Sequence, residues 1–185
     1  MLNKWEKDKL KRFQYLYLIL SLIVLLFWLF LIYGMSAKTG EESSGLSYEI
    51  AEFAYGLSVF HYLFQFDTFH LLIRKTAHFT EYGILSLLIM NFLHSCRVIV
   101  RSGNSNGINR KSVINRYFMI GTIIFCVAYA SLDEYHQSFV DGRGPSVRDV
   151  CIDTLGACVF LAVFCLCRKL LAKHSLNRNS KAHES

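Results

Sequence analysis

The sequence lacks the short motifs that mark the commonest catalytic and metal-binding sites. No His-Glu-x-x-His pair and no Cys-x-x-Cys pair occurs in its 185 residues, and zinc enzymes and zinc-stabilised folds usually carry one or the other. Ser131 and Ser138 lack the flanking glycines of a nucleophile elbow. The chain also has no internal repeat. These absences argue against a zinc protein, a serine hydrolase of the elbow type and a repeat protein.

Cysteine is absent from the long polar segment that follows the first apolar run. The cysteines lie inside apolar runs or at their ends, at Cys96, Cys126, Cys151, Cys158, Cys165 and Cys167. Disulfides are useful mainly in segments that face an oxidising exterior, so the sequence does not predict a disulfide framework. An unpaired cysteine usually serves as a small buried apolar side chain, and we expect that role here.

Long apolar runs dominate what the sequence does contain. Hydrophobic residues make up 53% of the chain and cluster in four runs. About 20 apolar residues cross the ~30 Å hydrocarbon core of a bilayer as a helix. The run from Tyr15 to Tyr33 is long enough by itself, and the other three suffice only if their polar ends lie at the membrane boundary. We therefore expect an all-α, polytopic membrane protein with four transmembrane helices, at about 13–35, 74–95, 117–136 and 149–168.

Lysine and arginine are unevenly distributed around these spans. Fifteen of the 20 lie before the first span, between the second and third, or after the fourth. Because cytoplasmic flanks hold the excess of these residues, we expect a multi-pass protein of the cell membrane with both termini in the cytoplasm. The net charge of +6 then reflects topology and contact with anionic lipid. The lipid bilayer is an expected partner, and a nucleic acid is not.

Three regions are expected along the chain. They are a basic cytoplasmic lead over residues 1–12, a membrane domain over 13–170 and a flexible cytoplasmic tail over 171–185. Within the membrane domain, Ser36 to Ser47 is predicted to be a polar linker. Tyr48 to Phe66 is apolar and aromatic with polar interruptions, which predicts an amphipathic helix on the outer membrane surface. A re-entrant segment is the alternative.

Ionisable residues gather where the apolar runs begin or end on the predicted extracytoplasmic side. Positions three and four apart share a helix face, so each of three helices brings a polar set to the same level. The members are Arg74, Lys75, His78, Glu81 and Tyr82 on the second span, Asp133, Glu134, His136 and Gln137 on the third, Arg143 in the following loop, and Asp149 and Asp153 on the fourth. Gly156 continues the face of the two aspartates and leaves room for a close neighbour.

Two interpretations of this polar set stay open. A charge within the membrane costs roughly 2.5–3.5 kcal/mol at its centre and less near the boundary, so these groups must be paired or hydrated. Either they form a salt-bridged clasp that fixes helix packing, or they line an outward-opening pocket in which arginines bind an anion and carboxylates and histidines act as acid and base. In the second case the catalytic candidates are Glu81, Asp133 and His136.

Individual roles can be assigned within the pocket interpretation. Arg143 is flanked by glycines, so we expect it to face a ligand and to contribute little to folding. Asp149 and Asp153 are expected to be structural and to hold Arg148 or Lys75 in place. The ligand-binding candidates are Lys75, His78, Glu81, Tyr82, Asp133, Glu134, Gln137 and Arg143, together with Asp149 and Asp153.

A metal site is a further possibility at the same place. Helical i, i+3 pairs from two helices, here His78 with Glu81 and Asp133 with His136, suit a divalent ion. The nearby arginines would oppose a cation. Neither a metal nor a cofactor is predicted.

These residues also fall into an ordered series of motifs. They read Lys75-x-x-His78-Phe79-x-x-Tyr82-Gly83, Asp133-Glu134-x-His136-Gln137-x-Phe139, Gly142-Arg143-Gly144 and Ser146-x-Arg148-Asp149-Val150-x-Ile152-Asp153-x-x-Gly156. The series resembles the pattern of the VanZ-like family of small bacterial membrane proteins. The similarity extends from the end of the first span to the end of the fourth.

The resemblance implies a role at the outer face of the membrane. The namesake of the family is associated with low-level resistance to the glycopeptide antibiotic teicoplanin, so a protein that binds or modifies a cell-envelope component is expected. An anionic lipid-linked or cell-wall precursor is then the expected ligand. An intramembrane hydrolase or transferase that uses Glu81 or Asp133 as its base is the alternative. A small proton-coupled carrier fits less well, because it would need ionisable groups at mid-membrane depth.

Overall fold

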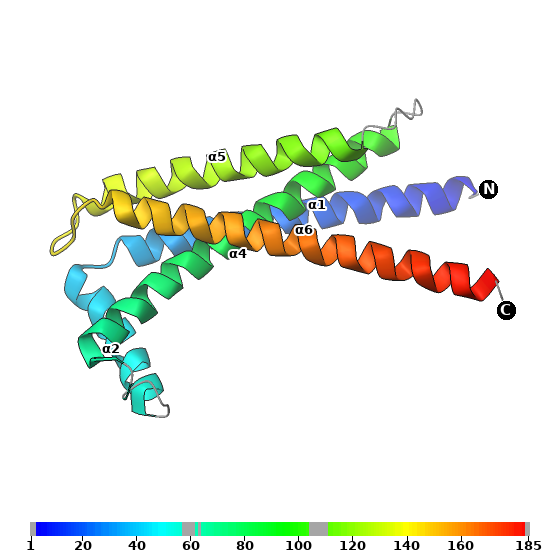
Figure 1. Ribbon diagram of the computed structural model, residues 1–185. Coiled ribbons are helices and arrows are strands. Elements are labelled where there is room, and N and C mark those ends of the chain that lie inside the picture. The colour runs from blue at the N-terminus through cyan, green and yellow to red at the C-terminus, as the bar shows by residue number, and fades with distance from the viewer. Residues whose placement is uncertain (1–2, 57–61, 63, 104–110, 184–185) are drawn as a thin grey trace.

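The computed structural model describes residues 3–56, 62, 64–103 and 111–183. Within these ranges the chain forms five helices and no strand (Figure 1), which confirms the all-α fold class. The helices are α1 (Lys4–Ser36), α2 (Gly40–Gly56), α4 (Phe66–Gly103), α5 (Lys111–Gln137) and α6 (Val147–His183).

Four of the helices contain segments that are long and apolar enough to cross a membrane. These segments are Asp8–Ser36, Phe66–Val100, Arg116–Gln137 and Val147–Leu171. Each of the four spans expected from the sequence lies within one of them. The protein is therefore a multi-pass membrane protein, as the apolar runs predicted.

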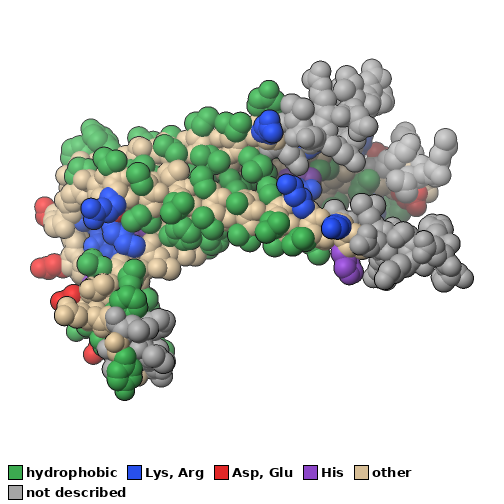
Figure 2. Space-filling model, in the orientation of Figure 1, with side chains coloured by type: hydrophobic (Ala, Val, Ile, Leu, Met, Phe, Trp, Pro, Cys, Tyr) green, Lys and Arg blue, Asp and Glu red, His purple; other side chains and the backbone are tan. Residues whose placement is uncertain are grey.

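The outer surface of the helix bundle is apolar. On α1 alone, the side chains of Leu16, Phe27 and Phe30 are all more than half exposed. Figure 2 shows hydrophobic side chains over the middle of the bundle and charged ones towards its two ends. A water-soluble monomer rarely exposes so much contiguous apolar surface, so this face is suited to contact lipid.

Helix α4 organises the bundle, because it contacts α1, α2, α5 and α6. The start of α1 and the end of α6 lie at one end of the bundle (Figure 1). The end of α1, the start of α4, the end of α5 and the start of α6 lie at the other, together with α2 (Figure 1). Successive spans thus run in opposite directions, and the polar sets of three helices arrive at the same end.

Two glycines allow α4 and α6 to cross closely. A Cβ atom on Gly156 would lie 2.1 Å from the carbonyl oxygen of Phe79, and one on Gly83 would lie 2.5 Å from the ring of Phe160. Small residues at such positions let two helix backbones approach in a membrane. The room expected beside Gly156 is therefore present, and α4 is the neighbour that uses it. The adjoining Tyr82 is fully buried in the core.

The segment after the first span differs from the expected linker. Helix α2 begins at Gly40, within the residues predicted to be irregular. Thr39 and Glu42 form a reciprocal cap at its start: the Glu42 amide donates to the Thr39 hydroxyl at 3.3 Å, and the Thr39 amide donates to the Glu42 carboxylate at 3.2 Å. The linker prediction was wrong from Gly40 onward, because this capping pair starts a helix in a segment whose polar composition suggests a loop.

The predicted amphipathic helix from Tyr48 to Phe66 overlaps α2 and the beginning of α4. Its middle falls on residues 57–61 and 63, which lie outside the described residues. The Tyr48 ring contacts the ring of Phe66 with centroids 4.9 Å apart, so α2 packs back on the start of α4. The additional helix exists, and its position relative to the membrane surface remains a prediction.

The ends of the chain are more helical than the sequence indicated. Helix α1 starts at Lys4 behind an Asn3 cap, and α6 continues to His183. The cysteines are free, as expected. Cys126 is buried in the core, whereas Cys151 and Cys167 are exposed, so the expected burial holds only in part.

Replacing Gly156 by alanine should destabilise the protein, because the new methyl group would meet backbone of α4. Overpacking of this kind typically costs about 1–3 kcal/mol, which a lower melting temperature in detergent would reveal. The matched control is Gly121→Ala on α5, where an added Cβ meets nothing within 4 Å. That variant should melt at or slightly above wild type, since alanine is the better helix former. Equal melting temperatures for the two variants would contradict the close crossing.

Candidate functional site

The structure brings the predicted polar residues together at one end of the bundle. We call this set the polar cluster; its members are Arg74, Lys75, His78, Glu81, Tyr82, Asp133, Glu134, His136, Gln137, Arg143, Asp149 and Asp153. Asp153 of α6 lies within electrostatic range of carboxylates on both α4 and α5, among them Glu81 and Asp133. Three helices and the loop between α5 and α6 therefore contribute to a single group of ionisable side chains.

An ion pair joins α4 to α6 at the edge of the polar cluster. The ammonium group of Lys75 contacts the carboxylate of Asp149. Both side chains are partly buried, with 33% and 19% of their surface exposed, so water screens the pair less than it would on an open surface. This contact confirms that Asp149 holds Lys75. Arg148, the other proposed partner, is exposed.

Glu134 fixes the start of α6. Its carboxylate accepts a hydrogen bond from the backbone amide of Ser146 at 2.7 Å. Ser146 in turn caps α6, since its hydroxyl accepts from the amide of Asp149 at 3.4 Å. Buried carboxylates need such donors to offset the loss of water, and Glu134 is 5% exposed. Glu134 therefore has a structural partner.

Asp133 is held within its own helix. The side-chain amide of Gln137, one turn further along α5, donates to the Asp133 carboxylate at 2.9 Å. Both side chains are buried. This bond orients one carboxylate oxygen of Asp133 and fixes the Gln137 amide, so the two ligand-binding candidates act as a pair.

The loop between α5 and α6 is tied to the end of α1 and the start of α2. Gly142 adopts a positive φ of 73°, which favours glycine. The amide of Gly40 donates to the carbonyl of Asp141 at 3.0 Å, and a Cβ on Gly40 would lie 2.4 Å from the Gly142 carbonyl oxygen. The two glycines thus permit a backbone contact that closes this end of the bundle.

Arg143 is turned inward from this loop, which corrects the expectation of a freely presented side chain. Its guanidinium group donates to the carbonyl of Met35 at 3.4 Å, in the last turn of α1, where the helix dipole favours a cation. Burial and the nearby charge of Arg74 lower the pKa of Arg143 below its ordinary value. Arg143 therefore contributes to packing as well as to the charge of the polar cluster.

Several buried polar atoms of the cluster have no hydrogen-bond partner in the described protein. They are Nε of Arg74, Nε and Nη1 of Arg143, the hydroxyl of Tyr82, Nε2 of His136 and Oδ1 of Asp153. Tyr82 is fully buried and Asp153 is 1% exposed. Buried polar groups in folded proteins nearly always bond to protein, water or a ligand. These atoms are available to hydrogen-bond a water molecule or a ligand.

The two histidines of the cluster have different surroundings. The Nδ1 atom of His78 lies 3.6 Å from the carboxylate of Glu81, one turn away on α4. The ring of His136 stacks on Tyr33 of α1, with ring centroids 4.9 Å apart. Along the described part of the chain, no group of three or more His, Cys, Asp or Glu side chains is arranged to hold a metal ion. Of the catalytic candidates, Asp133 lies within electrostatic range of both Glu81 and His136.

Helix α1 takes a larger part in the site than the sequence indicated. Its Trp28 donates to the backbone carbonyl of Glu81 at 3.1 Å, and Tyr33 and Met35 contact His136 and Arg143. An almost uniformly apolar run gives no polar periodicity from which these contacts could be read. The cap at Ser146 was detectable, because a serine three residues before an aspartate is a helix-start signal.

The fold and the polar cluster define a four-span α-helical membrane protein with an ionisable site at one end of its bundle. The chain belongs to the VanZ/LLP1 family, whose model matches residues 20–168. This match confirms the resemblance that the motifs indicated. No curated protein and no solved structure matched the chain.

The Lys75–Asp149 ion pair should stabilise the packing of α4 against α6. Asp149→Asn should lower the free energy of unfolding by roughly 1–3 kcal/mol, between the values for exposed and fully buried pairs. Melting in detergent measures the loss, and Arg148→Gln, which removes an exposed charge next to Asp149, is the control. Because the partners interact, the Lys75→Gln and Asp149→Asn double variant should lose less than the sum of the single losses. Strictly additive losses would rule out the interaction.

Proposed function

We propose that the polar cluster binds an anionic group of a cell-envelope component. The observation that carries this proposal is the pair of Arg74 and Arg143. Their guanidinium groups are close enough for each to affect the other electrostatically, and both have buried N–H groups without a protein partner. An anion bound between the two guanidinium groups would offset the repulsion between their positive charges. Guanidinium groups bind phosphate and carboxylate through parallel hydrogen bonds, so these two anions are the expected ligand groups.

The carboxylates of the polar cluster indicate which other groups the ligand carries. Asp153 presents a buried, unpartnered oxygen that accepts hydrogen bonds, and Glu81 lies within range of both Arg143 and Asp133. These carboxylates repel a bare anion and favour a ligand that also carries hydroxyl or amine donors. A lipid-linked or cell-wall precursor combines an anionic group with such donors. Its lipid or polymer part would extend into the membrane or the envelope.

The side of the membrane follows from the distribution of positive charge. Fifteen of the 20 lysine and arginine residues fall in residues 4–12, 97–116 and 168–181, the parts of the sequence that flank the spans on the side away from the polar cluster. Cytoplasmic flanks hold this excess. The proposal therefore places both termini in the cytoplasm and the polar cluster at the outer face of the cell membrane.

A contribution to glycopeptide resistance is the finer part of the proposal. The namesake of the VanZ-like family is associated with low-level resistance to teicoplanin. A protein that binds an envelope precursor at the outer face would change how much of that precursor is accessible to such an antibiotic. We propose this kind of contribution for the present chain.

A second candidate, an intramembrane hydrolase or transferase, is favoured by the contact between His78 and Glu81. A carboxylate that orients a histidine is a common arrangement for a general base. Glu81→Gln distinguishes the two functions. A catalyst would still bind its ligand and lose turnover, whereas a binding protein would lose affinity.

An anion bound by Arg74 and Arg143 should raise the melting temperature of the protein. With inorganic pyrophosphate as the probe, wild type should melt at a higher temperature in detergent, since a ligand at a hundred times its Kd stabilises by ~2.7 kcal/mol. Arg74→Gln and Arg143→Gln should lose this shift. The control Arg148→Gln removes the same charge from an exposed position and should keep it.

The same variants provide a test in cells. Arg143→Gln should lower teicoplanin resistance at equal protein abundance, while Arg148→Gln should not. If pyrophosphate, phosphate and acetate all fail to shift the melting temperature of wild type, the anion-binding proposal is wrong. If susceptibility follows only protein abundance, the polar cluster serves as a clasp between helices.

Topology can be tested independently of any ligand. Cysteines introduced at Ser44 of α2 and at Asp141 in the α5–α6 loop should react with a membrane-impermeant maleimide in intact cells, in a Cys151→Ser background. A cysteine introduced at Asn3, before α1, should react only after permeabilisation. Labelling of the Asn3 position in intact cells would reverse the orientation and move the polar cluster to the cytoplasmic face.

A further inference from the structure

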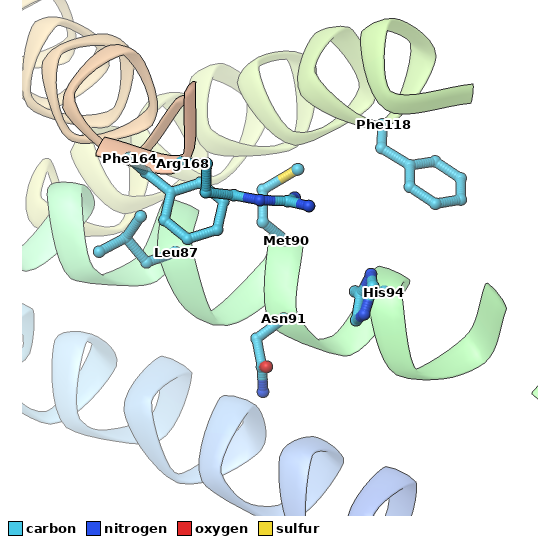
Figure 3. A pocket seen from close by; sticks show the side chains of 7 residues that line it. All are labelled: Leu87, Met90, Asn91, His94, Phe118, Phe164 and Arg168. Atoms are coloured by element: carbon cyan, nitrogen blue, oxygen red, sulfur yellow. The ribbon is translucent and has the colours of Figure 1, made fainter. Parts of the chain in front are cut away.

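A cavity lies at the opposite end of the bundle from the polar cluster. It has a volume of about 200 Å³ and opens between three helices. Helix α4 contributes Leu87, Met90 and His94, α5 contributes Phe118, and α6 contributes Phe164 and Arg168 (Figure 3). None of these residues belongs to the polar cluster, so the cavity is a separate feature of the molecule.

The cavity has an apolar part and a polar part. Leu87, Met90 and Phe164 supply the apolar side chains (Figure 3). Arg168 reaches past Phe164, with its guanidinium carbon 5.7 Å from the ring centroid, and its head group extends over Met90 (Figure 3). An arginine laid along an aromatic ring in this way is held by a cation–π contact. The guanidinium edge stays available to a ligand.

Two polar side chains of α4 also line the cavity. Asn91 also lines the cavity, and its side-chain oxygen accepts a hydrogen bond from the hydroxyl of Tyr17 at 2.7 Å. That bond orients the Asn91 amide and leaves its nitrogen as a donor. His94 is exposed at the same end. Figure 3 shows the Asn91 amide pointing towards α1 and away from Arg168, so the charge of Arg168 is the feature of the cavity that would bind an anionic group.

The charge of Arg168 is not balanced by the protein. Across the described ranges, no carboxylate forms an ion pair with it. The sequence explains why, since α4 after Glu81, α5 before Asp133 and α6 after Asp153 contain no acidic residue. The helices that line the cavity therefore offer Arg168 no carboxylate, and the acidic residues Glu6 and Asp8 at this end of the bundle lie on α1, which does not line it.

The depth of the cavity suits a lipid headgroup. The membrane-crossing segment of α5 begins at Arg116 and that of α6 ends at Leu171. Phe118 and Arg168 are therefore within one turn of the ends of these apolar segments. A volume of about 200 Å³ is below the ~300–1,000 Å³ typical of sites for drug-sized ligands. The cavity holds part of a ligand whose remainder lies in the bilayer.

We propose that this cavity is a binding site for an anionic phospholipid from the leaflet on the side of the chain termini. The phosphate group is bound by Arg168, and the adjoining part of one acyl chain packs on Leu87 and Phe164. Basic pockets between transmembrane helices bind lipid headgroups by this combination of charge and apolar contact. The proposal does not depend on the function of the polar cluster.

Lipid retention tests this site. The full chain is purified in neutral detergent with a mixture of phosphatidylglycerol and phosphatidylcholine, and the bound lipid is measured by native mass spectrometry. Wild type should retain phosphatidylglycerol in preference to phosphatidylcholine. Arg168→Gln should retain about tenfold less of it, the effect of losing one charge-assisted hydrogen bond. Lys169→Gln removes the neighbouring exposed charge and should behave as wild type.

Two more measurements separate a bound lipid from diffuse charge attraction and from a free phosphate ion. Leu87→Phe fills the apolar part and should lower retention while Arg168 is intact, provided that the variant melts as wild type does. If Arg168→Gln and Lys169→Gln lose phosphatidylglycerol retention equally, the lipid is attracted by the positive charge of this end as a whole. The proposed site would then be wrong. If inorganic phosphate displaces phosphatidylglycerol at concentrations where sulfate does not, the cavity binds a free phosphate ion and the lipid assignment is wrong.

Discussion

The close crossing of α4 and α6 is the contact on which the rest of the structure depends. Gly156 lies against the backbone of Phe79, and Gly83 lies under the ring of Phe160. One turn before Phe79 on α4, Lys75 reaches Asp149 on α6. A lone charge at the membrane boundary is costly, and the crossing supplies its partner. Two glycines without functional groups thus decide where the ionisable side chains can be placed.

The polar cluster contains side chains of two kinds, and the clasp and pocket interpretations apply to different ones. Lys75, Asp149 and Glu134 have protein partners that join one element to another. Arg74 and Asp153 keep buried atoms without a partner. Removing a paired residue should loosen the bundle, whereas removing an unpartnered one should change what the bundle can bind. A cluster can therefore stabilise the fold and hold a ligand when the two tasks fall to separate residues.

Hydropathy and helical spacing were enough to predict the four spans and the gathering of polar residues at one end. They could not predict how each side chain is used, because that depends on the rotation of one helix against another. Arg143 was expected to contribute little to folding, yet it also donates to the backbone carbonyl of Met35, a contact that no sequence pattern predicts. The start of α2 at Gly40 is a different case, since the Thr39 and Glu42 cap was visible in the sequence. The polar composition of this segment favours a loop, and the local capping pair favours the helix that forms.

The two ends of the bundle differ in how they can select an anion. At the polar cluster, arginines and carboxylates lie within range of one another, so net attraction is weak and a ligand must match the positions of donors and acceptors. At the cavity, the lining helices carry no acidic residue near Arg168. Under the proposal, the charge of Arg168 attracts an anion and the apolar wall favours a lipid. Geometric matching favours specificity, and uncompensated charge favours general affinity. The first end is therefore suited to recognising one component, and the second to anchoring the protein among abundant anionic lipids.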